Sequence, residues 1–267
     1  MREPTVRRPQ KEFDPTPHRR ELVAIIDEIA AGSDLDSRAI DQILKKYPRS
    51  GTGFFSRSEI IAGFREFGST RARDLDEEVF LERLRLRPVR TLSGVTPVTV
   101  LTKPYPCPGK CIFCPNDVRM PKSYLSDEPG AQRAEDNRFD PYLQAWNRLR
   151  AYHSMGHPVA KVELIVLGGT WSFHPEAYQV WFAKRCFDAL NDFGKRVDRR
   201  AEAGSAPARF RELPSQLDGR EPEASYNQLV SGHLRDAHAA FGQAIGAGEF
   251  GDIAANGIAG PGGGRCE

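Results

Sequence analysis

The sequence has no long apolar run and few cysteines, and both shortages narrow the classes of protein to which it can belong. No stretch approaches the roughly 18 apolar residues of a membrane-spanning helix, so no membrane partner is expected. The basic residues near the N-terminus are not followed by the apolar core of a secretory signal, which favours a cytoplasmic location. Thiols stay reduced in that compartment, which argues against a disulfide framework.

Charge is nearly balanced, and internal repeats are absent. The net charge is only +2 over 267 residues, so overall charge selects no partner. Residues 1–17 form a basic arm that suits the phosphate backbone of a nucleic acid, although a solvated, disordered arm is the alternative. No repeat with a period of about 20–50 residues is present, which excludes a solenoid or propeller.

Residues 18–90 show the apolar spacing of short helices. A capping-box pattern at Ser56 and Glu59 marks one helix start. The four segments with this spacing are 18–32, 36–48, 56–68 and 74–88. They predict a small helical domain, for which nucleic-acid binding and plain packing are the two interpretations.

Residues 91–193 alternate between strand and helix patterns, which predicts an α/β fold with a parallel sheet. The second strand is apolar enough to be buried on both faces. Between 115 and 138, many Pro and Gly residues predict a long loop. The expected elements are strands at Val98–Leu101 and Val162–Leu167 and helices at 139–156 and 174–193. Residues 194–267 show no third strand and predict a poorly structured tail.

Three cysteines, Cys107, Cys111 and Cys114, follow the first strand with the spacing C-x3-C-x2-C. Structural zinc takes four ligands, and a fourth would have to come from elsewhere in the chain, such as His153, His157 or Cys186, whose spacing does not recommend them. A [4Fe–4S] cluster held by three thiolates leaves one iron open for another ligand. The spacing favours the cluster over zinc and over thiols without metal.

This cysteine pattern, with Phe113 before the third cysteine, resembles that of the radical S-adenosylmethionine (SAM) superfamily. There the amino and carboxylate groups of SAM chelate the fourth iron, and an electron from the cluster cleaves SAM to a 5′-deoxyadenosyl radical. The glycine turn after the second strand, Gly168–Gly169–Thr170, is similar to the superfamily motif that contacts the SAM amino group. Without the cysteines, it would be read as an ordinary strand-to-helix turn.

Four segments together resemble the catalytic subunit of Elongator and its single-chain bacterial and archaeal counterparts: LTKPYPCPGKCIFCPND, SYLSDEPGAQRA, RFDPYLQAWNRL and GHPVAKVELIVLGGTWSFHPEAYQ. The resemblance covers about residues 15 to 193. It implies modification of the tRNA wobble uridine, U34, by a radical SAM domain joined to an acetyltransferase domain. The implied co-substrate is acetyl-CoA, the product a carboxymethyluridine-type nucleoside, and the partner the anticodon loop of tRNA.

The resemblance also implies roles for single residues. Cys107, Cys111 and Cys114 would hold the cluster, and Lys161 aligns with a lysine that contacts acetyl-CoA, although a solvated strand-edge lysine is the plain alternative. Tyr124 and Arg133 match a loop near the active-site mouth, where Arg133 would contact phosphate or cofactor. The helical domain would bind tRNA. No catalytic residue is identified, and whether the protein acts as a homodimer or with Elongator-like subunits is open.

The chain departs from this family after about residue 194, where the motifs of a third strand and of the acetyltransferase domain are missing. The sequence therefore predicts an incomplete radical-SAM (βα) barrel behind a small helical N-terminal domain. Truncation or a frame shift of a longer gene is expected, as are low stability and weak activity of this chain alone. The rival hypotheses are a metal-stapled nucleic-acid-binding module without catalysis and another radical SAM enzyme.

Overall fold

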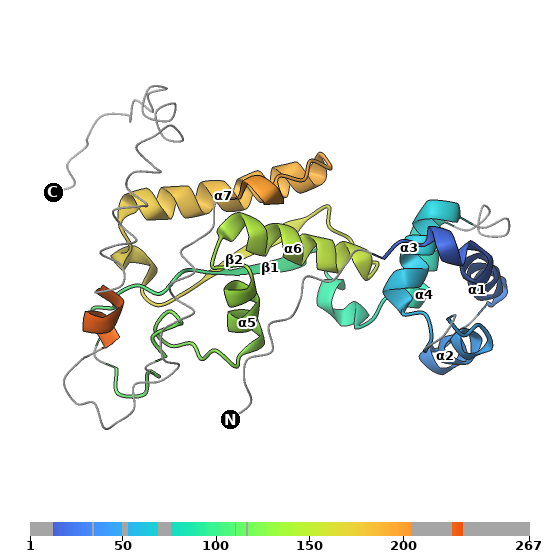
Figure 1. Ribbon diagram of the computed structural model, residues 1–267, viewed down its shortest axis with the longest axis horizontal. Coiled ribbons are helices and arrows are strands. Elements are labelled where there is room, and N and C mark those ends of the chain that lie inside the picture. Colours follow the sequence, from blue (N-terminus) through green and yellow to red (C-terminus); the bar gives the residue numbers. More distant parts are fainter. Residues whose placement is uncertain are drawn as a thin grey trace.

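The computed structural model describes residues 13–33, 35–49, 53–68, 76–109, 111–115, 117–203 and 226–231. Helices α1 to α4 gather at one end of the molecule, and a two-stranded sheet with α5, α6 and α7 forms the other end (Figure 1). The basic arm expected at 1–17 lies almost wholly outside the described residues. No described helix is both long and apolar enough to cross a membrane.

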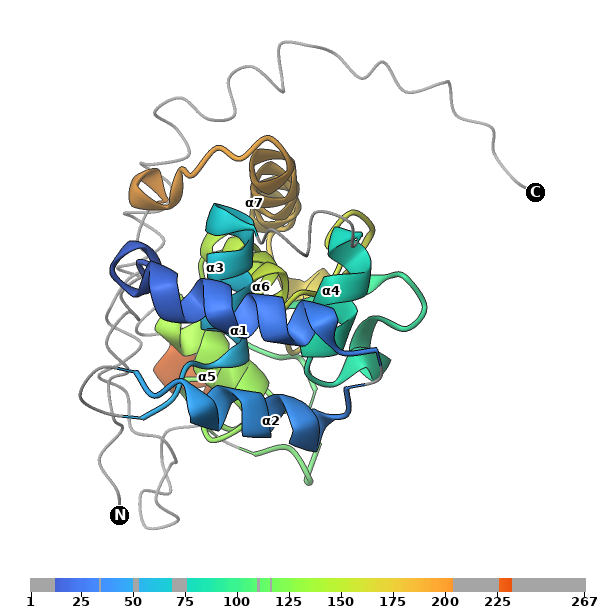
Figure 2. The ribbon, with the colours of Figure 1, turned by 90° about the vertical axis from the view of Figure 1, so that its right-hand side faces the viewer.

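The helical end matches the apolar spacing of the sequence. Its helices are α1 (Arg19–Ala31), α2 (Ser37–Lys46), α3 (Arg57–Phe67) and α4 (Glu77–Leu84). The capping box at Ser56 and Glu59 is formed, so two backbone N–H groups at the start of α3 are satisfied. Gly63 lets α1 approach α3, because a Cβ there would lie 3.0 Å from Cδ1 of Leu22. The view along this end shows α1 crossing in front of α3 (Figure 2).

The second part is a mixed α/β unit built on two parallel strands. Its elements are η3 (Pro88–Thr91), β1 (Thr96–Leu101), α5 (Pro129–Asp136), α6 (Pro141–Ser154), β2 (Val162–Leu167), η4 (Trp171–Phe173), α7 (Glu176–Gly194) and η5 (Arg200–Glu202). Thr96 pairs with Val162 and Leu101 with Leu167, so both strands end at the same level. The α/β class and the parallel sheet expected from the sequence are confirmed.

The core of this unit lies between β1 and the helices that cover it. Val98 and Val100 of β1 are fully buried against α6, and α7 packs on α6 in turn (Figure 1). Trp146 and Phe182 are buried in the same cluster. This core fixes where β1 ends and therefore where the cysteine loop, residues 104–116, begins.

The two outer edges of the sheet differ. On β1, the side chain of Gln144 donates to the Leu101 carbonyl and accepts from the Leu101 N–H, both at 2.9 Å. Pro97 has no N–H to offer at all. On β2 the expectation of burial on both faces is wrong, because no residue of Val162–Leu167 is buried. Within the described residues the sheet has only two strands, so one side of β2 lacks a neighbour.

The long loop expected between 115 and 138 is also partly wrong, because it contains α5. Pro129 occupies the first helical turn, where the missing N–H costs nothing. Ala131 and Ala134 are buried against Leu101, and their small side chains let α5 approach β1 closely. Pro129 and Gly130 are among the Pro and Gly residues that predict the loop, but they begin a helix here.

Parts of the tail expected to be poorly structured make defined contacts. Arg199 forms an ion pair with Asp192 at 2.6 Å, next to η5. Residues 226–231 are helical and bury Tyr226 and Val230. The remainder of that expectation, 204–225 and 232–267, lies outside the described residues.

Candidate functional site

The cysteine loop and the glycine turn meet at the carboxyl ends of the two strands, as the sequence predicts. Because Leu101 is opposite Leu167, Thr102 and Gly168 continue side by side beyond the sheet. Cys107 Sγ lies 3.4 Å from Thr170 Oγ1, although 63 positions separate them. One rim therefore carries both motifs, which is where open parallel sheets place their ligands.

The three thiols of the loop are free and within reach of solvent. Cys107 and Cys114 are half-buried, and Cys111 is exposed. A Cβ on Gly109 would lie 3.5 Å from the sulfur of Cys107 and 3.6 Å from that of Cys111. Cys114 Sγ lies 3.0 Å from the Ser123 hydroxyl. Among the described residues, no three His, Cys, Asp or Glu side chains converge into a ready metal site.

The donor set of the loop could hold an iron–sulfur group, and thiolates are also ligands of zinc. The donor set is three soft thiols, and the missing side chain of Gly109 leaves space between two of them. The candidates for a fourth zinc ligand lie elsewhere. His157 is buried against Thr91, with 2.9 Å between Nδ1 and the hydroxyl oxygen, and His153 contacts Arg65. Cys186 lies on α7 and is buried in the core of the α/β unit, and burial raises the pKa of its thiol to about 12.

The exit of the loop is held by Asp117, which is buried. Its carboxylate accepts hydrogen bonds from the backbone N–H groups of Arg119 and Ser126, both at 3.1 Å. Arg119 also forms an ion pair with Asp117 at 3.4 Å. The chain after Cys114 therefore has a fixed path from the rim towards α5.

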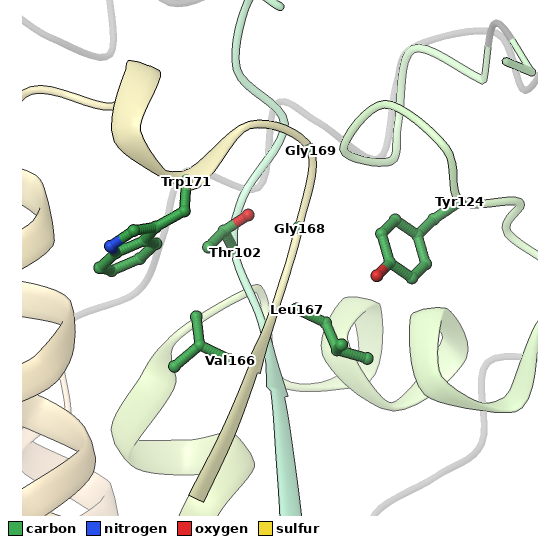
Figure 3. Close-up of a pocket in the computed structure, with 7 residues that line it drawn as sticks. All are labelled: Thr102, Tyr124, Val166, Leu167, Gly168, Gly169 and Trp171. Carbon is green, nitrogen blue, oxygen red and sulfur yellow. The ribbon is translucent and has the colours of Figure 1, made fainter.

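A pocket of about 440 Å³ opens beside the glycine turn (Figure 3). This volume is in the range of small-molecule sites. Trp171 of η4 lies on one side of the strand ends and Tyr124 on the other (Figure 3). The lining residues are Thr102, Tyr124, Val166, Leu167, Gly168, Gly169 and Trp171.

Two polar side chains line this pocket, those of Thr102 and Tyr124. Thr102 Oγ1 is buried and has no hydrogen-bond partner among the described residues. Burial raises the pKa of the Tyr124 hydroxyl, while a hydrogen bond from the Gly168 backbone opposes that rise. Gly168 has no room for a side chain, since a Cβ would lie 2.0 Å from Thr102 Oγ1. The glycine therefore allows β1 and β2 to stay adjacent where the pocket begins.

A buried basic cluster behind the cysteine loop was not predicted from the sequence. Lys103 is 7 % exposed, and its Nζ lies 5.1 Å from the ring centre of Tyr178. His174 stacks on Tyr178 at 4.7 Å and also contacts Tyr105. Burial lowers the pKa of Lys103 to about 8, and burial with the nearby lysine lowers that of His174 to about 4. The sequence signal that could have indicated this cluster is a lysine two residues after a buried strand.

Lys161 and Arg133 do not join this rim. Lys161 is exposed just before β2, and its carbonyl accepts from the Thr96 N–H at 2.9 Å, so it lies at the amino ends of the strands. Six strand residues, about 20 Å, separate that level from the glycine turn. Arg133 belongs to a helix, not to the expected loop, and the charges that lower its pKa besides burial are Arg148 and Arg90. The roles predicted for Lys161 and Arg133 stay predictions.

Comparison with known proteins gives a consistent set of relatives. No protein-family model matches the chain. A tRNA uridine(34) acetyltransferase of Methanocaldococcus jannaschii is 42% identical over 176 residues, which are 62% of this chain and 31% of that protein. The Dehalococcoides mccartyi protein of the same name is 52% identical over 102 residues, 38% of this chain and 22% of that one.

Eukaryotic proteins match a shorter segment. Elongator complex protein 3 of Drosophila melanogaster is 38% identical over 126 residues, or 43% of this chain and 23% of that protein. The chain thus spans less than a third of the length of each of these relatives. Over the matched part, the chain is homologous to the tRNA uridine(34) acetyltransferases and to Elongator complex protein 3.

Proposed function

We propose that this chain contributes the SAM-binding and tRNA-binding part of an enzyme that modifies the wobble uridine of tRNA. The observation that carries the proposal is the 3.4 Å approach of Cys107 to Thr170, which joins the cysteine loop and the glycine turn at one rim. The names of the relatives supply the reaction class and the substrate. The strands of 91–193 would then be the start of a radical SAM (βα) barrel.

In this proposal Cys107, Cys111 and Cys114 hold a [4Fe–4S] cluster with one iron open to SAM. When bound, the cluster supplies the electron for reductive cleavage of SAM. The chain itself provides thiolate ligands on a loop that Asp117 orders at its exit. It also provides a pocket at the rim, with Trp171 on one side and Tyr124 on the other.

The pocket beside the glycine turn is the proposed SAM site. The backbone of Gly169 is exposed and open to a polar ligand group because the residue has no side chain, whereas the Gly168 backbone already makes a hydrogen bond to Tyr124. The buried hydroxyl of Thr102 lacks a partner among the described residues, so a ligand amino or carboxylate group would compensate its burial. Trp171 offers an apolar face for the rest of the ligand.

The helical domain, 18–90, and the basic arm are proposed to contact tRNA phosphates, which position the RNA without reading its sequence. The wobble base would have to leave its stack to reach the rim. Acetyl-CoA is the proposed co-substrate, by analogy with the named activity of the relatives. Lys161 remains a candidate contact for it.

Mass spectrometry of wobble uridines tests the substrate. A strain that lacks the gene should lose a modified U34 nucleoside, and the intact gene should restore it. A gene encoding the Cys111→Ala variant should not restore it, whereas the Cys186→Ala variant should, because Cys186 lies in the core away from the rim. Unchanged uridines in the deletion strain would instead favour another radical SAM reaction.

The rival proposal of a metal-stapled binding module gives a different result. In that case the purified chain would bind tRNA and contain zinc, and SAM would neither bind nor be cleaved. The pocket beside Gly168 has no purpose in such a module, which is why we prefer the enzyme.

A further inference from the structure

A short helical turn, residues 226–231, lies on the cysteine loop although 120 positions separate Asn227 from Cys107. Its sequence, YNQLVS, belongs to the part of the chain without family motifs. It nevertheless makes directed polar contacts with the loop and buries two of its own side chains, Tyr226 and Val230. Such contacts at the rim call for a functional interpretation.

Asn227 contacts the backbone on both sides of Cys107. Its Oδ1 accepts from the Cys107 N–H at 2.9 Å, and its Nδ2 donates to the Cys107 carbonyl at 2.8 Å. One amide side chain thus replaces the pair of hydrogen bonds that a neighbouring strand would make. The peptide planes around Cys107 are fixed, and with them the direction in which its side chain leaves the backbone.

The same turn also holds the chain after the loop. The Tyr226 hydroxyl donates to the Met120 carbonyl at 2.7 Å, in a buried position. Val230 is fully buried beside Val118. The Nζ of Lys122 lies over the Tyr226 ring, 4.7 Å from the ring centre. The entry and the exit of the cysteine loop are therefore attached to a single turn of helix.

We propose that the 226–231 turn positions the cysteine loop before the iron–sulfur group binds, and that Asn227 is the positioning residue for Cys107. This inference rests on the proposed function of the loop. A loop of Pro, Gly and exposed residues would otherwise have to lose its conformational freedom when the group binds. Holding both of its ends in advance lowers that cost, which is the general benefit of preorganisation.

Thiol alkylation of the metal-free, reduced chain tests the proposal directly. Two net hydrogen bonds correspond to roughly a tenfold change in local opening. The alkylation rate of Cys107 by iodoacetamide should therefore rise about tenfold in Asn227→Ala. The rate of the exposed Cys111, measured in the same digest by mass spectrometry, should stay unchanged. Asn191→Ala, on the exposed face of α7, is the matched control and should leave both rates alone.

Two further variants keep the test decisive if the alanine variant folds poorly. Asn227→Asp retains the acceptor for the Cys107 N–H but not the donor to the carbonyl, so an intermediate rate is expected. Tyr226→Phe removes only the hydroxyl that binds Met120 and should speed hydrogen exchange of the amides near Val118. Protection of the β1 amides reports whether each variant is folded. If folded Asn227→Asp and Tyr226→Phe both behave like the unmodified chain, the proposal is overturned.

Iron loading separates this inference from the proposed function. The unmodified chain and Asn227→Ala are reconstituted anaerobically with iron and sulfide, and bound iron is followed over time. Slower uptake or faster loss of iron in the variant, with faster Cys107 alkylation, supports both ideas. If the unmodified chain takes up no iron while alkylation still responds to Asn227, the proposed function fails and the positioning of the loop stands.

Discussion

Replacement of Gly168 by alanine should damage the rim more than replacement of its neighbour Gly169. A Cβ on Gly168 would lie 2.0 Å from Oγ1 of Thr102 and 3.1 Å from its Cβ and Cγ2. Rotation of the Thr102 side chain would remove the overlap with Oγ1, but the close contact with the Cβ of Thr102 would remain. Sliding of β1 is opposed because the Thr102 N–H donates to the Leu167 carbonyl at 2.8 Å.

Overpacking of this kind costs about 1–3 kcal/mol of the free energy of unfolding. Gly169→Ala is the control, because its Cβ would meet Lys122 at 3.4 Å, an ordinary contact. Gly168 does not have the positive φ that would strain any side chain, so the effect is steric. Thr102→Ala in the Gly168→Ala background should recover part of the loss, since the closest contact disappears.

The assay is urea unfolding followed by circular dichroism, with equilibrium binding of SAM as a second readout. We expect Gly168→Ala to lower both stability and SAM affinity, and Gly169→Ala to leave stability within about 0.5 kcal/mol. Equal stability of the two alanine variants would refute the reasoning, because the Cβ of Gly168→Ala overlaps Thr102 whereas that of Gly169→Ala makes only an ordinary contact with Lys122.

Three further outcomes follow from the structure. Burial lowers the pKa of Lys103 from 10.5 to about 8. Between these two pH values the unfolded chain binds more protons than the folded chain, so the free energy of unfolding should rise as the pH rises from 8 to 10.5. This rise should be roughly 3 kcal/mol larger in the unmodified chain than in Lys103→Met. The pKa of His174 is lowered from 6.5 to about 4, so the free energy of unfolding should fall as the pH falls from 6.5 to 4. His174→Phe should flatten this dependence of stability on pH. If the pH dependence of the variant runs parallel to that of the unmodified chain, the prediction is contradicted. Ser56→Ala should cost about 1 kcal/mol in urea unfolding through the lost cap of α3, and no change would mean that the cap is not formed in solution.

Strongly periodic elements were predictable from the sequence. The apolar run Val162–Leu167 matches β2 residue for residue, and the cap of α3 forms where the Ser56–Glu59 pattern indicates it. The meeting of Cys107 with Thr170 was also predictable, because parallel strands of matched register bring their carboxyl ends together. These features depend on local pattern and on one rule of sheet topology.

The remaining features depend on contacts that no local pattern encodes. Helix α5 was missed because Pro129 and Gly130 read as breakers until their place at a helix start is known. The exposure of Val166 depends on what covers its face of the sheet, not on the apolar sequence of β2. The hydrogen bonds between Asn227 and Cys107 join positions 120 residues apart. Tertiary packing decided each of these outcomes.

Anaerobic reconstitution is the most direct test of the claim that Cys107, Cys111 and Cys114 hold a cluster with an open iron. The unmodified chain should bind about four irons and four sulfides, and the electron paramagnetic resonance spectrum of the reduced protein should change when SAM is added. Each of the three cysteine-to-alanine variants should lose the iron, whereas Cys186→Ala should keep it. Stoichiometric zinc in place of iron, or a spectrum that SAM does not alter, would contradict the account.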